Sequence, residues 1–129
     1  MNKSFIKIAS LLGALAVVLG AFGAHALKKI LSDTYLATFE TGVKYQLYHV
    51  FALLAVGILY KEFTNKWVLL SGRLFCLGIF IFCVSLYLLT LMRGLQINVF
   101  EWLGAITPLG GISLIAGWIC LFVGIAKKN

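Results

Sequence analysis

Two histidines and a neighbouring carboxylate are the side chains in this sequence best suited to chemistry. His25 and His49 are the only histidines of the chain, and Glu40 lies between them. Imidazole nitrogens and a carboxylate oxygen are suitable ligands for zinc or copper, and an imidazole also carries protons near neutral pH. No HxxxH pair or other ligand spacing occurs, so we predict no metal site and no cofactor. The histidines then have either a ligand or proton role, or a structural role in which each ring bonds a loop carbonyl or the turn around Pro108.

Four hydroxyl side chains complete the set of candidates. Tyr45 lies one helical turn before His49, so a helix presents both on one face. Ser85, Tyr87 and Thr107 lie in apolar stretches, where a polar group is costly unless it faces the protein interior. None of them has an acid or base at useful spacing, so we predict no catalytic residue and no enzymatic activity. We expect these side chains to form one polar cluster with the two histidines and the carboxylate.

The composition places these residues in a membrane protein. Only 12% of the 129 residues are charged and 62% are hydrophobic, and the mean hydropathy is +1.03. A water-soluble domain needs more polar residues to cover its surface. The net charge is +7, but the lysines gather at the ends of apolar runs, as membrane topology signals do. We therefore expect this chain to lie in a lipid bilayer and not to bind nucleic acid.

The apolar runs predict an all-α membrane protein with a single transmembrane domain over residues 1–129. Each run is close to the roughly 20 residues that span a hydrocarbon core of about 30 Å. The four expected spans cover about residues 5–26, 43–60, 67–92 and 103–126. Ser32 or Asp33 can cap a helix after the first span. This cap predicts a short interfacial helix that bends near Gly42 into the second span.

Four spans place both termini on the same side of the membrane, together with the loop near residues 61–66. That side carries seven cations and the other side carries four, and an excess of Lys and Arg marks the cytoplasmic side. We therefore predict a multi-pass protein of the cell membrane with cytoplasmic N- and C-termini. The candidate polar residues then lie in the non-cytoplasmic half. The cations on the predicted cytoplasmic side are Lys3, Lys7, Lys61, Lys66, Arg73, Lys127 and Lys128.

Small residues recur every three or four positions in the first and fourth spans, and we call these two rows the small-residue seams. Small side chains let helices approach closely in lipid, and a 3.5-residue period predicts a left-handed bundle with crossing angles near 20°. We expect the two seams to pack against each other, antiparallel, or one seam to face a second protomer. Pro108 predicts a kink or a late start of the fourth helix. The packing candidates are Gly13, Gly20, Gly23, Pro108, Gly110, Gly111, Gly117 and Gly124.

Four segments of the sequence resemble one family of membrane proteins. They read GAFGAHALKK, YLATFETGVKYQLYH, SLYLL and ITPLGGISLIAGW, and in this order they resemble the DUF423 family, also catalogued as UPF0382, to which the animal transmembrane protein 256 is related. The resemblance implies a small polytopic protein, of the bacterial inner membrane in most members, whose biochemical function is uncharacterised. The family usually reads FSGSLY where this chain has Cys83 and Val84 in place of the second and third residues.

Three classes of function are compatible with these observations. The first is a non-enzymatic membrane protein that acts through lipid or partner contacts, with a second copy or another membrane protein as the possible partner. The second is a transporter or channel for a small solute or ion that uses the outward-facing polar cluster. The third, an intramembrane enzyme, has the least support. We favour the first, because four short spans lack a buried charge pair of the kind that marks transport pathways.

Overall fold

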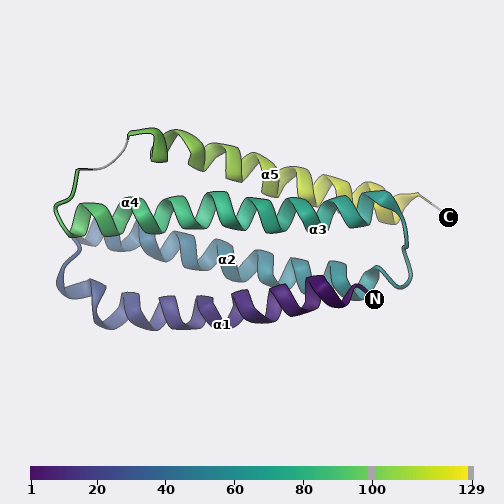
Figure 1. Ribbon diagram of the computed structural model, residues 1–129, viewed down its shortest axis with the longest axis horizontal. Helices are drawn as coiled ribbons and strands as arrows, with labels where there is room; N and C mark the ends of the chain where they lie inside the picture. The colour runs from purple at the N-terminus through teal and green to yellow at the C-terminus, as the bar shows by residue number, and fades with distance from the viewer. Residues whose placement is uncertain (99–100, 128–129) are drawn as a thin grey trace.

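The computed structural model describes residues 1–98 and 101–127, and four of its helical stretches are long and apolar enough to cross a membrane (Figure 1). These stretches contain 27, 27, 29 and 26 residues. The predicted all-α class with four spans is therefore confirmed. Lys128 and residues 99–100, between the third and fourth predicted spans, lie outside the described residues. In chain order the helices are α1 (Lys3–His25), η1 (Leu27–Lys29), α2 (Asp33–Leu59), α3 (Lys66–Gly78), η2 (Ile79–Cys83), α4 (Val84–Gly94) and α5 (Glu101–Ala126).

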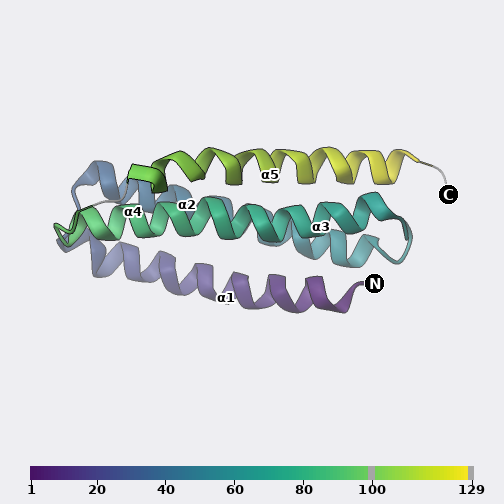
Figure 2. The same cartoon turned by 45° about the horizontal axis from the view of Figure 1, so that its top comes forward.

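The four spans run side by side along the long axis of the molecule, as Figures 1 and 2 show from two directions. The N-terminus and the end of α5 lie at the same end in both views. The third span consists of three segments in line: α3, the π-helical turn η2 and α4. A π turn adds one residue to a helix, so it shifts the faces that follow it relative to those before it.

Polar side chains fix where three of the helices begin. Asn2 and Ser32 accept hydrogen bonds from the amides of Phe5 and Tyr35, at 3.2 and 3.3 Å. The predicted helix cap after the first span is thus confirmed, with Ser32 as the capping residue. Asn65 accepts from two amides at the start of α3, and its side-chain amide donates to the Gly124 carbonyl at 2.9 Å. Asn65 therefore joins the start of α3 to the last turn of α5.

The predicted interfacial helix is not a separate element. Residues 33–59 form one helix that passes Gly42 without interruption, and only the three-residue η1 precedes it. The prediction placed a bend at Gly42 because glycine in a helix interior costs about 1 kcal/mol relative to alanine. In the structure a β-carbon at Gly42 would lie 2.7 Å from the Tyr87 ring. The glycine therefore serves close packing against α4, and the second span begins ten residues earlier than predicted.

The two small-residue seams do not pack against each other. The α1 seam packs on α2: β-carbons placed at Gly13 and Gly20 would lie 3.4 and 3.6 Å from Val50 and Val43. The α5 seam packs on the third span. Gly117 and Gly124 face Phe75 and Val68 of α3, Gly110 faces the backbone of Phe82 in η2, and Gly111 lies near the Phe82 ring.

Each seam therefore meets the span next to it in sequence. The periodicity identified the packed faces correctly. It could not identify which helix each seam packs on, because a row of small residues fits against any apolar helix. The left-handed crossing stays a prediction.

The helix α5 begins at Glu101 and continues through Pro108. Of the two expected outcomes, the late start is therefore wrong and the kink stays a prediction. Pro108 lacks an amide hydrogen, which removes the usual donor to the carbonyl four residues earlier. That carbonyl belongs to Gly104, where a β-carbon would meet nothing within 4 Å. Gly104 and Pro108 lie in the first two turns of α5, where backbone groups are least shielded. Leu103, in the first turn of α5, is nevertheless buried.

Candidate functional site

The predicted cluster around two histidines does not form. His25 is exposed in the last turn of α1, and Glu40 is also exposed. His49 is buried, sixteen residues into α2, which places it about 24 Å along the helix from Asp33. The prediction brought the two histidines together because it began the second span near Val43. With α2 starting ten residues earlier, His49 moves to the middle of the bundle and His25 stays at its end.

Both ring nitrogens of His49 have partners. Its Nε2 lies 3.2 Å from the indole Nε1 of Trp118, and its Nδ1 lies 2.7 Å from the Tyr45 carbonyl oxygen. An indole N–H only donates, so Nε2 must be the acceptor. The hydrogen then resides on Nδ1, which donates to the carbonyl. The neutral ring is thus fully satisfied, and a metal or a second proton on Nε2 would displace Trp118.

An aromatic cluster encloses this histidine. Its ring is stacked on Tyr45 at 6.1 Å between centroids and lies 5.6 Å from Phe75, while Phe75 and Trp118 pack edge to face at 5.2 Å. Tyr45 also contacts Phe82 at 4.9 Å. The cluster joins α2, α3, η2 and α5. Tyr45 and His49 therefore share a helix face as predicted, and both side chains on this face pack against other aromatic rings.

The sequence analysis missed a buried polar contact that joins several helices. Gln46 of α2 is 2% exposed. Its amide nitrogen donates to the Leu12 carbonyl of α1 at 2.8 Å, and its amide oxygen accepts from the Tyr87 hydroxyl of α4 at 2.7 Å. One side chain thereby joins three spans. A signal was present, because a glutamine inside an apolar run is costly in lipid unless it faces protein.

Ser85 and Thr107 meet, as the predicted cluster required. Their hydroxyl oxygens are 2.7 Å apart. Ser85 also lies 2.9 Å from the Phe82 carbonyl, and Thr107 lies 3.1 Å from the Leu103 carbonyl. Two hydroxyl hydrogens cannot serve three contacts, so the pair donates either toward Phe82 or toward Leu103. The predicted polar cluster is thus divided into three separate contacts: Gln46–Tyr87, Tyr45–His49–Trp118 and Ser85–Thr107.

One hollow is a groove on the side of the bundle. It has a volume of about 440 Å³ and an almost entirely apolar lining, with Gln46 and Tyr87 as its polar members. It forms because α1 packs along α2 and leaves the third span uncovered. Only 17% of the most apolar stretch of α1 is buried, against 39–50% for the other three spans. We call this hollow the lateral groove; it is lined by Ile8, Leu12, Leu15, Leu19, Gln46, Cys76, Ile79, Phe80, Cys83, Val84 and Tyr87.

The fold and this set of contacts define a small polytopic membrane protein, in which hydrogen bonds between buried side chains join the spans and a groove opens sideways. Comparison with known proteins specifies the family. The profile of "Protein of unknown function (DUF423)" matches residues 19–111, which is more than half of the chain. The chain therefore belongs to the DUF423 family, as its motifs predicted.

Curated relatives cover nearly the whole chain. A UPF0382 membrane protein of Staphylococcus haemolyticus is 42% identical over 97% of both chains. The UPF0382 membrane protein YwdK of Bacillus subtilis is 41% identical over 97% of this chain and 98% of its own. The UPF0382 inner membrane protein YgdD of Escherichia coli is 35% identical over 98% of this chain and 93% of its own. No solved structure matches the chain.

Proposed function

We propose that this protein is a non-enzymatic membrane protein that acts through lipid contacts, by holding an acyl chain in the lateral groove. The observation that carries the proposal is the groove itself. Its lining runs from Ile8 to Leu19 on α1 and from Cys76 to Tyr87 on the third span. Eleven residues of helix correspond to about 16 Å along the axis. The groove is therefore long, apolar and located on a helix pair that spans the membrane.

The shape of the groove favours an acyl chain over a partner helix. A volume of about 440 Å³ spread over about 16 Å gives a cross-section of roughly 30 Å². A helix with side chains is about 10–12 Å across and needs a cross-section of roughly 80 Å² or more. A partner helix could therefore lie only across the mouth of the groove, whereas a single hydrocarbon chain fits inside it.

The transporter or channel considered from the sequence has weaker support. His49, Gln46 and Tyr87 use their polar atoms on one another or on neighbouring groups. A path for an ion or solute through the middle of the bundle would need these bonds to break. The polar atoms of this region instead contribute to holding the spans together.

We also propose that both termini face the cytoplasm. The support is the distribution of Lys and Arg, seven on the side of the termini and four on the other. Two lysines and a tryptophan lie together at that end of the bundle, as is typical of a membrane boundary. The ammonium groups of Lys66 and Lys127 lie 5.5 and 4.9 Å from the Trp67 ring centre. Tryptophan and lysine are characteristic of the interface between lipid and water.

Lipid retention tests the proposed function. The protein is purified in a mild detergent, and bound lipid is counted by native mass spectrometry. Leu15 lines the groove, so Leu15→Trp should fill it and lower the retained lipid several-fold. Val17 is exposed on α1 outside the groove, so Val17→Trp is the matched control and should retain lipid like the wild type. Equal retention by all three proteins would overturn the proposal.

A further inference from the structure

We infer that the lateral groove belongs to a binding site for an anionic phospholipid, with the lipid phosphate at Arg73. This inference rests on the proposed function, because it adds a headgroup to the acyl chain held in the groove. Three observations carry it: a continuous stripe on the third span, the position of Arg73 on that stripe, and the lack of a protein partner for its charge.

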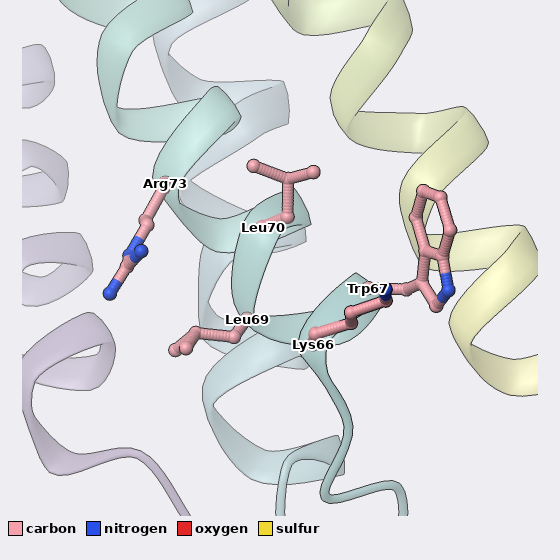
Figure 3. A pocket seen from close by; sticks show the side chains of 5 residues that line it. All are labelled: Lys66, Trp67, Leu69, Leu70 and Arg73. Atoms are coloured by element: carbon pink, nitrogen blue, oxygen red, sulfur yellow. The ribbon is translucent and has the colours of Figure 1, made fainter.

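The stripe connects the apolar groove with a cationic pocket. A second hollow of about 330 Å³ lies at the start of α3 and is lined by Lys66, Trp67, Leu69, Leu70 and Arg73 (Figure 3). From this pocket to the start of the groove, lining residues recur at intervals of three and four, which places them along one face of α3. Their order is Lys66, Leu69, Arg73 and Cys76, and beyond the π turn the groove lining continues with Phe80, Val84 and Tyr87.

Arg73 lies at the end of the groove that is nearer to the chain termini. It precedes the groove residue Cys76 by one helical turn, and it is seven residues, or about 10 Å, from the start of α3 at Lys66. Phe5 of α1 packs on the neighbouring Gly72, so α1 and α3 touch here and the groove opens beyond this contact. In Figure 3 the Arg73 side chain points to the side on which α1 lies, whereas Trp67 lies toward α5.

The charge of Arg73 has no protein partner among residues 1–98 and 101–127: neither a hydrogen bond nor a carboxylate within 4 Å. The second arginine of the chain differs. Arg93, in α4, donates to the Tyr35 hydroxyl at 2.9 Å and lies over its ring at 5.3 Å. A guanidinium near the hydrocarbon boundary is costly without an anion, and its planar fork fits two phosphate oxygens.

An anionic lipid satisfies both parts of this arrangement at once. Its phosphate meets the Arg73 guanidinium, and one of its acyl chains follows the lining of the third span into the groove. Basic pockets between transmembrane helices bind anionic headgroups in this way, and each basic residue near the surface contributes about 1 kcal/mol, or roughly five-fold in affinity. A zwitterionic lipid fills the groove equally well but carries an ammonium that offsets its phosphate.

Competition between two lipids with the same acyl chains tests this inference. Purified protein is titrated with phosphatidylglycerol or phosphatidylcholine, and binding is measured by native mass spectrometry. We expect the wild type to prefer phosphatidylglycerol roughly five-fold. Arg73→Gln should abolish the preference while phosphatidylcholine binding stays unchanged, and Arg73→Lys should restore part of it. Arg93→Gln makes the same change in net charge away from the groove and should keep the preference. Helical content and melting temperature show that each variant is folded.

The outcomes separate this inference from the proposed function. Equal binding of both lipids by the wild type, or a preference that survives in Arg73→Gln, overturns the headgroup assignment and leaves the acyl-chain groove in place. Equal loss in Arg73→Gln and Arg93→Gln means that net charge, and not this site, sets the preference, which also overturns it. If the wild type binds neither lipid, the proposed function itself fails.

Discussion

The indole N–H of Trp118 on α5 donates a hydrogen bond to Nε2 of His49 on α2 across 3.2 Å. This bond fixes the tautomer of a buried histidine and explains its structural role. It also crosses between two spans that are far apart in sequence. Its contribution to stability can be measured directly.

Trp118→Phe should lower the free energy of unfolding. The change keeps an aromatic ring but leaves the His49 acceptor unpaired, and hydrogen bonds between membrane helices contribute about 0.6 kcal/mol on average and up to about 1.7. Reversible unfolding in mixed micelles measures the effect, alone and in a His49→Phe background. The two changes should be coupled, with the double variant less destabilised than the sum. Strict additivity would show that the bond contributes nothing.

Tyr87→Phe should destabilise the protein because it leaves the oxygen of Gln46 without its donor at 2.7 Å. A buried unsatisfied acceptor costs about 1–3 kcal/mol, and membrane proteins lie toward the lower end of such values. Tyr48→Phe is the matched control, since Tyr48 is exposed, and it should be close to neutral. The same unfolding experiment compares them. Equal effects from the two substitutions would contradict the role assigned to the Tyr87 hydroxyl.

Glycine-to-alanine substitutions within α5 should differ strongly in effect. A β-carbon at Gly117 would lie 2.7 Å from the Phe75 ring, whereas at Gly104 it would meet nothing within 4 Å. Overpacking typically costs about 1–3 kcal/mol, so Gly117→Ala should lower the melting temperature. Gly104→Ala should be neutral or stabilising by up to about 1 kcal/mol, because alanine favours the helix. A Gly117→Ala protein as stable as the wild type would disprove the close contact between α5 and α3.

The proposed topology predicts opposite results for fusions at two positions. Green fluorescent protein attached after Asn129 should be fluorescent, and alkaline phosphatase attached there should be inactive, because cations concentrate on the side of the termini. Fusions after Asn98, in the segment between α4 and α5, should give the reverse pattern. An active phosphatase at the C-terminus would place that end outside the cytoplasm.

The sequence predicted the four spans because apolar runs of membrane length follow from the thickness of the bilayer. It also predicted a helix cap at Ser32 or Asp33, which the structure assigns to Ser32. It placed Ser85 and Thr107 in one polar cluster, and these two residues do meet. It could not predict that each small-residue seam packs on its sequence neighbour, because a row of glycines fits any apolar partner. The position of His49 was misjudged for a local reason: Gly42 was interpreted as a break, whereas its small size admits the Tyr87 ring.

The periodicity of the sequence could not predict two further features, the π turn and the lateral groove. The composition of the π turn η2 does not distinguish it from an ordinary helical turn, and Gly110 of α5 packs against the backbone of its residue Phe82. Ser113 donates to the Leu74 carbonyl next to it at 2.9 Å. The lateral groove arises from what α1 leaves uncovered. The groove depends on how the helices are placed relative to one another, and the sequence of one span does not determine this placement.

The pairing of each seam with its neighbour has a consequence for how the chain assembles. The first two spans form one antiparallel hairpin and the last two form another, and each can close as soon as its second member is in the bilayer. The hydrogen bonds that Tyr87 donates to Gln46 and that Trp118 donates to His49 then join one hairpin to the other. If the chain is divided in the loop between the hairpins, near Glu62, the two fragments should therefore reassociate when they are produced together. The polar contacts between the hairpins would hold them in register.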